Sequence, residues 1–351
     1  MHRIRGALKD YDWGIPDGLA RWSGEADGRP QAELWFGLHP SGPSPIIDGV
    51  GTLADACASD DVPLLVKLLA AGRPLSIQVH PDAAQAARGF AAQGDAAIYS
   101  DDREKTELLV ALETFDAFCG WRDVTEAAAV LSHLPGTQRT IDALRAGDRV
   151  TALRSLLELA NTVDLEVWNA QLPDAVRTAG LPEKDVRAYA TVVSEYPRDA
   201  GVPATVLLDF LTLDPGDAVY VPAGIPHSYV RGIGLEVMTS SDNVLRLGLT
   251  GKPMHIDEAF ACLDWESQPL VIRGQSRIAP SGAPFAVDVV HEASVETGRY
   301  RLVLAIDGPM RVESDGVLLE LAPGESLALT AEEPTIHVQS AGRGAVVRAT
   351  A

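Results

Sequence analysis

Short runs of β-forming residues, separated by Pro and Gly turns, are the feature that most restricts the fold of this chain. From about residue 204 to the C-terminus these runs recur roughly ten residues apart, beginning with residues 205–208 and 218–221. Nearer the N-terminus, residues 64–69 and 75–80 read as strands separated by the turn at 71–74. This spacing is typical of all-β barrels and sandwiches, so we predict a mainly β protein.

The central segment changes character and predicts helices. Residues 123–199 contain Ala-, Leu- and Arg-rich helical patterns, including 150–159 and 183–193. Asp123, followed three residues later by Glu126, fits a capping box at the start of the first helix. We therefore expect an α-helical insert at 123–199, a first β-barrel from 1–122 plus 200–264, and a C-terminal barrel at 265–351.

A faint internal repeat suggests that the two barrels are alike. Residues 321–334 repeat the pattern of residues 213–226, so the offset between the copies is 108 residues. Thr335 then stands where His227 stands in the first copy. We expect the second barrel to keep the scaffold, bind no metal and serve a structural role.

The charge of the chain argues against two classes of partner. Lys and Arg number 29 and Asp and Glu 49, which gives a formal net charge of −20 that repels nucleic acid and anionic lipid. No apolar run approaches the roughly 20 residues of a transmembrane helix, and the first residues lack the apolar core of a secretory signal. We expect a cytoplasmic protein with no nucleic-acid or membrane partner.

Cysteine usage restricts the ligands that a metal could find. Cys57, Cys119 and Cys262 lie far apart, with no CxxC pair, and an odd number argues against a disulfide framework. Any bound metal would therefore use His, carboxylate or amide ligands.

Residues 75–80 alternate apolar and polar side chains. Because side chains along a strand alternate between its two faces, Ser76, Gln78 and His80 share one face. Polar groups inside a barrel are costly unless they are satisfied, either by a metal or by hydrogen bonds within a polar lining. Lys105 and Glu107 form a second pair at this spacing, which could also be an ordinary exposed ion pair at a strand end.

Residues 216–229 give the sharpest signal. A strand leads into a Pro- and Gly-rich turn that delivers His227 at the start of the next strand, and the restricted backbone aims the imidazole. Tyr229 shares its face. This pattern resembles the second motif of cupin barrels, in which the His is a metal ligand.

Further polar residues follow the His227 strand. Glu236 and Asp242 add carboxylates, and Arg246 and Lys252 are a close cationic pair suited to an anionic group, or else a solvated Arg and Lys on a loop. Three other histidines, His39, His255 and His337, have no partner at metal spacing, and we expect them to be structural or exposed.

Together these motifs resemble the type I mannose-6-phosphate isomerases. The similar segments keep the family order over roughly residues 5–260: 11–14 (YDWG), 32–37 (AELWFG), 75–82 (LSIQVHPD), 105–108 (KTEL), 120–122 (GWR), 226–229 (PHSY) and 241–246 (SDNVLR). Two departures occur. Glu104 and Thr106 stand where the family has a His and a Pro before its metal-binding Glu, and Ala83 stands where it has a Lys.

The resemblance implies two cupin-type barrels, or jelly rolls, with a helical insert, and one Zn²⁺ per chain. It implies isomerisation of mannose 6-phosphate and fructose 6-phosphate through a cis-enediol. Carried over by motif, the metal ligands are Gln78, His80, Glu107 and His227, and the catalytic arginine is Arg246. Further catalytic candidates are Lys105, Glu236 and Asp242, among which the sequence does not choose a base, and candidate substrate contacts are Trp13, Ser76, Tyr229 and Lys252.

Two other functions fit parts of the pattern. A metal-dependent cupin oxygenase would use two His and a carboxylate without a phosphate site, which the amide of Gln78 and the Arg246–Lys252 pair argue against. A non-catalytic carbohydrate-binding cupin would not need a complete ligand set. We expect a phosphorylated hexose as substrate and a monomer or weak homo-oligomer.

Overall fold

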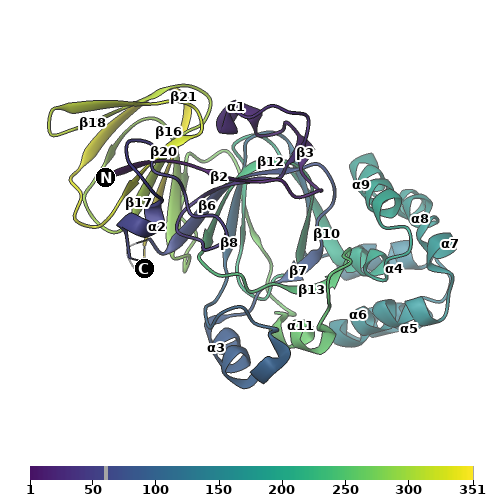
Figure 1. The fold of residues 1–351 in the computed structure, drawn as a ribbon. Coiled ribbons are helices and arrows are strands. Elements are labelled where there is room, and N and C mark those ends of the chain that lie inside the picture. Colours follow the sequence, from purple (N-terminus) through teal and green to yellow (C-terminus); the bar gives the residue numbers. More distant parts are fainter. Residues whose placement is uncertain (59–61, 351) are drawn as a thin grey trace.

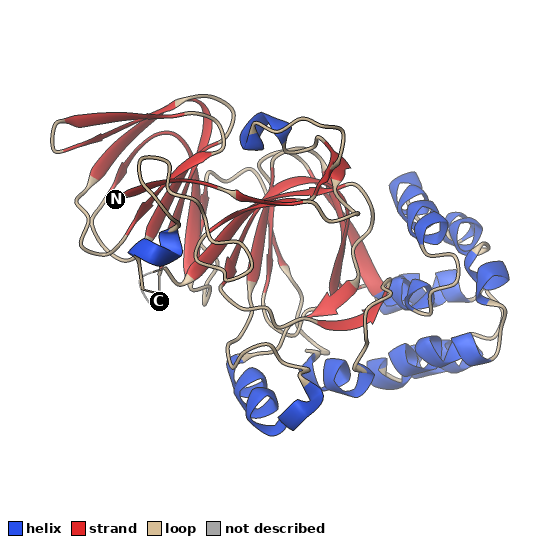
Figure 2. Cartoon of the chain, in the orientation of Figure 1, coloured by secondary structure: helices blue, strands red, loops and turns tan. Residues whose placement is uncertain are grey.

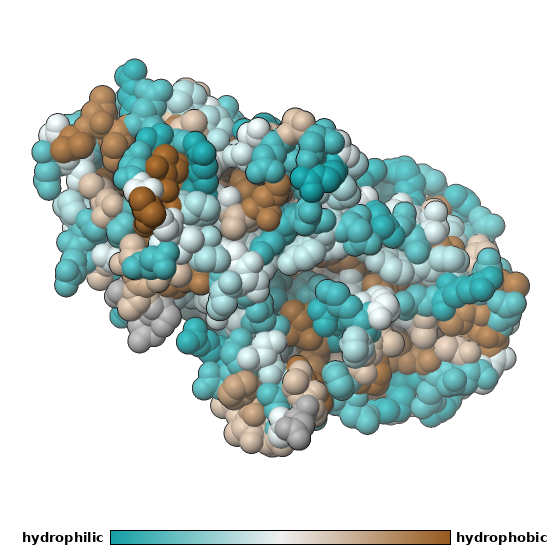
Figure 3. All heavy atoms as spheres, viewed as in Figure 1, coloured by the Kyte–Doolittle hydropathy of each residue, from teal (hydrophilic) through white to brown (hydrophobic). Residues whose placement is uncertain are grey.

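The computed structural model describes residues 1–58 and 62–350 and is mainly β, as predicted. Two bodies of antiparallel strands lie next to each other, and an array of helices lies at the far side of the first body (Figures 1 and 2). Hydrophilic side chains cover much of the face seen in Figure 3, with smaller groups of apolar side chains between them.

The first body is an 11-stranded sheet that folds over on itself. Its main path is β14 (Leu270–Ile272), β11 (Ala218–Val221), β8 (Glu107–Ala111), β12 (His227–Thr239), β6 (Leu64–Ala71), β5 (Glu33–Phe36) and β2 (Ala7–Lys9). Beside it lie β7 (Ile77–Val79), β9 (Phe115–Trp121), β10 (Leu208–Leu213) and β13 (Leu245–Gly248). Strand β12 joins the two layers, because residues 227–231 pair with β7 and β9 and residues 232–239 pair with β6 and β8.

The second body is an 8-stranded sheet formed mainly by the C-terminal third of the chain. Its strands are β1 (His2–Arg5), β15 (Arg277–Ile278), β16 (Phe285–Val295), β17 (Arg301–Ala305), β18 (Met310–Ser314), β19 (Val317–Leu321), β20 (Glu325–Leu329) and β21 (Ile336–Ala349). A separate two-stranded ladder joins β3 (Ile15–Pro16) to β4 (Pro30–Gln31).

The helices gather in the central segment. Within it lie α4 (Val124–Leu131), α5 (Gln138–Arg145), α6 (Arg149–Glu158), α7 (Leu165–Asn169), α8 (Leu172–Thr178) and α9 (Glu183–Glu195). The carboxylate of Asp123 accepts hydrogen bonds from the backbone N–H groups of Thr125 and Glu126, so Asp123 caps α4. The Glu126 carboxylate lies 3.5 Å from Arg122, so the contact of Glu126 is with Arg122 and the cap is a simple N-cap and not the expected capping box. Elsewhere lie α1 (Ala20–Ser23), α2 (Leu53–Ala56), α3 (Ala83–Ala92), α10 (Gly201–Ala204) and α11 (Ile256–Cys262).

The helices pack on the outer face of the layer that contains β7, β9 and β12. Ile77, Phe118 and Val230 point away from the sheet interior and join a core with the helical side chains. Buried Arg122, at the end of β9, donates to the backbone carbonyl of Leu208 and lies 3.4 Å from Asp185 of α9. The layer that contains β7, β9 and β12 is therefore supported on its outer face by packed helices.

Two predicted boundaries differ from the structure. Strand β1 pairs with β20, so the first residues complete the C-terminal sheet and not the first one. Strand β14 pairs with β11, so residues 270–272 belong to the first sheet although they fall within the expected 265–351 barrel. Both pairings join distant parts of the chain, which local pattern does not reveal.

The strand predicted at 205–208 is also wrong. Residues Thr205–Leu207 form a 3-10 helix that continues α10, and strand β10 begins only at Leu208. The hydroxyl of Thr205 donates to the carbonyl of Val202, and the whole segment is buried. Tertiary packing here overrides the β preference of Thr and Val.

The repeat corresponds to one turn used twice. Gly216 and Gly324 both have positive φ, of 94° and 83°, and each donates its N–H to the end of a neighbouring strand, at Ala111 and Ala305. Strands β11 and β20 follow these turns directly. The two sheets therefore share the same local scaffold.

Candidate metal centre and active site

Three side chains converge in the interior of the first sheet. His80 follows β7, Glu107 opens β8 and His227 opens β12, and all three are buried. His80 Nε2 lies 3.2 Å from Glu107 Oε1, and His227 Nε2 lies 3.3 Å from Glu107 Oε2. Their ligand atoms all lie within 4.8 Å of one another, which makes them a candidate metal site.

Hydrogen bonds orient both imidazoles for a metal. His80 Nδ1 lies 2.8 Å from the carbonyl oxygen of Asn243, and His227 Nδ1 lies 3.0 Å from that of Ile225. Because a carbonyl only accepts, each Nδ1 donates its proton to that carbonyl, and each Nε2 is the ring nitrogen that faces inward. Burial, helped by the positive charge of Lys105, lowers the pKa of His80 to about 4, which keeps that ring neutral.

The donor atoms of this arrangement suit a cation. The buried Nε2 of His80 has no hydrogen-bond partner, although a carboxylate oxygen lies 3.2 Å away, because both atoms are acceptors. A divalent ion between the lone pairs would satisfy them together. Two imidazole nitrogens and a carboxylate suit Zn²⁺, and carbonyl partners on Nδ1 are the usual orienting groups of zinc histidines.

Gln78 and Arg246 extend this site along one row of the sheet. Gln78 of β7 is paired with His227 on one side and with Arg246 of β13 on the other. Cross-strand partners point to the same face, so the amide and the guanidinium lie on the face that carries His227. Arg246 is half-buried, and burial lowers its pKa without any carboxylate partner within the described chain.

Lys105 is buried at the metal site. Its Nζ lies 3.0 Å from Glu107 Oε1, so this pair is not an ordinary exposed ion pair. Burial raises the pKa of Glu107, but the positive charge of Lys105, together with the nearby imidazoles, outweighs that effect. The net effect holds the pKa of Glu107 well below its usual value, so it remains a carboxylate that can bind a cation.

A second buried charge cluster was missed by the sequence reasoning. Lys67 Nζ lies 2.9 Å from Glu236 Oε2 and 3.3 Å from Glu33 Oε1, and Trp35 donates its indole N–H to Glu33. Burial alone would lower the pKa of Lys67, but the attraction of the two carboxylates raises it. The sequence did contain a signal for this cluster, because Lys67 is the one charged residue within the apolar run 64–69 and therefore needs a buried partner.

Comparisons with known proteins agree with this geometry. Residues 1–124 match the family model of the phosphomannose isomerase type I catalytic domain. The mannose-6-phosphate isomerases of Salmonella typhimurium and Shigella flexneri are 31% and 30% identical to this chain, in each case over 98% of both proteins. The chain belongs to the mannose-6-phosphate isomerase family.

Solved structures of the family share the whole fold. A mannose 6-phosphate isomerase from Salmonella typhimurium, bound to its substrate fructose 6-phosphate and to zinc, is 28% identical and superposes with a TM-score of 0.85. A mannose 6-phosphate isomerase bound with zinc and yttrium is 28% identical, with a TM-score of 0.86. Each comparison covers 100% of both chains.

Asp242 lies beside a histidine that sequence reasoning had set aside. His39 Nε2 lies 2.7 Å from Asp242 Oδ2, and His39 Nδ1 accepts the backbone N–H of Ser41. The ring therefore donates from Nε2, and this hydrogen bond lowers the pKa of Asp242. His39 is buried against Trp35, so of the two expected alternatives it is structural and not exposed.

The candidate substrate residues have different environments. Tyr229 is buried in the interior cluster, and its hydroxyl has no hydrogen-bond partner. Burial raises its pKa, and the charges of Glu236 and Glu107 add to the effect. Trp13 packs at the edge of the same cluster and stacks on Tyr11, while Ser76 is half-buried and Lys252 is exposed.

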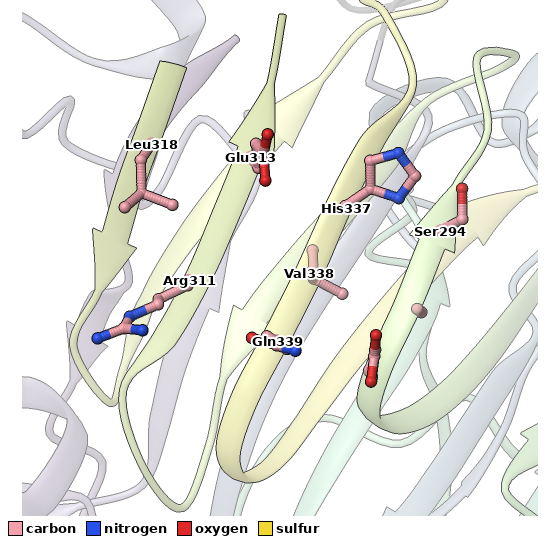
Figure 4. Close-up of a pocket in the computed structure, with 9 residues that line it drawn as sticks. Ser294, Arg311, Glu313, Leu318, His337, Val338 and Gln339 are labelled. Atoms are coloured by element: carbon pink, nitrogen blue, oxygen red, sulfur yellow. The ribbon is translucent and has the colours of Figure 1, made fainter. Parts of the chain in front are cut away.

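The C-terminal sheet contains a hollow of about 510 Å³ on its polar face. Figure 4 shows Glu313, His337 and Ser294 on adjacent strands at this hollow.

Across residues 1–58 and 62–350, the group formed by His80, Glu107 and His227 is the one arrangement of His, Cys and carboxylate ligands close enough to hold a metal. No helix in the same residues has the length and apolar character that a membrane crossing requires.

Proposed function

We propose that this chain is a zinc-dependent isomerase that interconverts mannose 6-phosphate and fructose 6-phosphate. The observation that carries the proposal is the convergence of the His80 and His227 Nε2 lone pairs on Glu107 in a buried site. Membership of the mannose-6-phosphate isomerase family supports the substrate, and relatives bound to zinc, one of them also to fructose 6-phosphate, support the metal.

Four side chains would hold the metal: Gln78, His80, Glu107 and His227. Zinc in this place supplies Lewis-acid polarisation of the sugar oxygens next to the reacting carbons. Gln78 would supply a neutral amide oxygen beside His227, so Glu107 would be the negatively charged member of the ligand set. Burial of His80, Glu107 and His227 excludes bulk water and would strengthen electrostatic interactions with the enediolate.

Proton transfer between C1 and C2 requires a group that can accept and return a proton. Glu236 is a candidate, because burial raises its pKa while Lys67 opposes that effect. Lys105 lies next to the metal carboxylate and could donate to a sugar oxygen from Nζ. Asp242, oriented by His39, is a third candidate.

Anion recognition rests on Arg246 and Lys252. Arg246 is half-buried without a carboxylate partner within the described chain, so an anionic oxygen of the substrate would satisfy it. We assign it to the developing enediolate and Lys252 to the phosphate, with Tyr229, Ser76 and Trp13 as contacts to the sugar. We expect the enzyme to act in the cytoplasm as a monomer or weak homo-oligomer.

The proposal is tested by a coupled assay with mannose 6-phosphate, run before chelation, after chelation and after zinc is restored. We expect activity, loss and recovery, with one zinc per chain by elemental analysis. Full activity of a metal-free preparation would overturn the zinc dependence. Metal binding without turnover would favour a carbohydrate-binding cupin, and oxygen consumption without isomerisation would favour an oxygenase.

A further inference from the structure

The end of the helical insert contacts two of the strands that carry the candidate site, β7 and β13. At the turn before β7, Arg73 Nε lies 2.7 Å from Glu195 Oε2, and the hydroxyl of Tyr196 donates to the carbonyl of Pro74 at 2.8 Å. At the turn after β13, the contact is made by Asp199. These are the two neighbouring strands on which Gln78 and Arg246 are paired.

Asp199 accepts three backbone hydrogen bonds with one carboxylate. Its Oδ1 lies 2.6 Å from the nitrogen of Gly201 and 2.9 Å from that of Leu249, and its Oδ2 lies 3.0 Å from that of Thr250. Hydrogen bonds to an ionised acceptor are stronger than neutral ones. The carboxylate therefore joins its own segment to the residues that follow β13.

The turn that Asp199 binds is in a conformation that ordinary residues avoid. Leu249, which is buried, has φ of 55°, and the preceding Gly248 has φ of 151°. A Cβ on Gly248 would lie 2.2 Å from the Cα of Gly201, so the two backbones touch. A left-handed non-glycine residue persists only where its surroundings hold it, and the two hydrogen bonds from Leu249 and Thr250 to Asp199 hold this one.

Asp199 is itself anchored by the insert. Buried Asn169, at the end of α7, donates its side-chain N–H groups to the carbonyl oxygens of Pro197 and Asp199, at 3.0 and 3.4 Å. A continuous set of contacts thus runs from the helical core through Asp199 to the end of β13. Arg246 lies two residues before Gly248 in that strand.

We propose that Asp199 is a positioning residue that fixes the end of β13, so that the Arg246 guanidinium faces the metal site beside Gln78. The inference rests on the proposed function for the role of Arg246. In this proposal the helical insert supports the reaction indirectly. It contributes no strand to the site, but it sets the position of β13.

The test uses Asp199→Asn in the full-length zinc enzyme. The amide keeps the size of the side chain but presents an N–H₂ group to one of the backbone donors, so at least one hydrogen bond is lost. We expect kcat to fall by about 10- to 100-fold, because a small displacement of a catalytic group has effects of this size. Zinc content should not change. Asp148→Asn is the matched control, because Asp148 caps α6 of the same insert and accepts from Thr151.

A double-mutant cycle separates positioning from general structural support. If Asp199 acts through Arg246, Asp199→Asn should change kcat by less than about twofold in an Arg246→Ala background. Equal losses in both backgrounds would overturn the proposal. If Asp199→Asn does not accumulate as a folded protein, Asp199→Ser keeps one acceptor and enters the same cycle.

Hydrogen exchange provides a measurement that does not depend on turnover. The amides of Leu249 and Thr250 should exchange about tenfold faster in Asp199→Asn than in the parent or in Asp148→Asn, as expected for one lost hydrogen bond to a charged group. Unchanged exchange would overturn the proposal even in an active enzyme. A parent protein that does not isomerise mannose 6-phosphate would instead refute the proposed function, while the exchange result would still decide whether Asp199 holds the turn.

Discussion

Arg301 occupies in the C-terminal sheet the strand position that Glu107 occupies in the first sheet. Glu107 opens β8 and pairs with Val221 at the end of β11, and Arg301 opens β17 and pairs with Leu329 at the end of β20. The buried guanidinium of Arg301 donates to four backbone carbonyls, those of Glu296, Thr330, Glu333 and Pro334. Where the first sheet places the carboxylate of the candidate metal site, the second places the positively charged Arg301 side chain.

We expect Arg301→Met to destabilise the protein by about 3 kcal/mol or more, because it leaves buried carbonyl groups without donors. The metal centre lies in the other sheet, so zinc content should stay the same. Thermal or urea unfolding measures the loss, with Arg299→Met as control because Arg299 is exposed two residues away. A stability equal to that of the control would mean that Arg301 does not hold the C-terminal sheet together.

Removal of one imidazole should empty the metal site. His80→Ala deletes an oriented Nε2 donor, and we expect zinc content to fall from one per chain towards zero together with isomerase activity. His337→Ala, in the exposed hollow of the C-terminal sheet, should keep both. Elemental analysis and the coupled assay check this. Zinc retained at full level by His80→Ala would exclude His80 as a ligand, and a second zinc lost from His337→Ala would contradict the metal-free second barrel.

Local sequence patterns predicted the β character and the position of the helices, because alternation and capping act over a few residues. The alternation at 75–80 also identified the strand that carries Gln78 and that His80 follows directly. The pairing of β1 with β20 was not predictable, because neither strand shows locally which partner lies more than 300 residues away.

The same limit applies inside the site. His39 and Asp242 are 203 residues apart, and Lys67 and Glu236 are 169 residues apart, so each appears in the sequence as an isolated charge or imidazole. Their pairing follows from the closure of the sheet. The resemblance to a known family provided the metal set, and the orientation of each imidazole depends on backbone carbonyls that side-chain patterns do not reveal.

The buried Lys67 cluster should be sensitive to the loss of one partner. Lys67→Met leaves Glu236 and Glu33 buried without their cation, and we expect a loss of about 3–5 kcal/mol in the free energy of unfolding. Adding Glu236→Gln removes one unpaired charge and should restore part of that stability. Urea unfolding of the single and double variants checks this, and a double variant less stable than Lys67→Met would contradict it.

The His39–Asp242 pair should make a pH-dependent contribution to stability. The hydrogen bond from His39 lowers the pKa of Asp242, so the folded state favours the carboxylate. Its contribution is therefore full above the ordinary carboxyl pKa of about 4 and is lost as the pH falls through the lowered value. Because Asp242 is half-exposed, we expect less than about 1 kcal/mol. Unfolding of Asp242→Asn and the parent should differ at pH 7 and converge in acid; a constant difference would refute the linkage.

Arg246 and Lys252 should have separable roles in the reaction. Arg246 lies on the metal-site face, paired with Gln78, whereas Lys252 is exposed beyond the end of β13. If Lys252 binds only the phosphate, it stabilises the substrate and the transition state equally. Lys252→Ala should then raise KM and leave kcat nearly unchanged. An unchanged KM would remove Lys252 from the phosphate site.

Arg246→Ala should instead lower kcat, by about 10²–10³-fold, because its guanidinium would stabilise charge that develops only in the enediolate. Arg246→Lys keeps the charge without the planar fork and should recover only part of the rate. Steady-state kinetics on mannose 6-phosphate, with zinc content measured for each variant, separates a lost metal from a lost catalytic group. A normal kcat with a raised KM in Arg246→Ala would move Arg246 to the phosphate and leave enediolate stabilisation to the metal and Lys105.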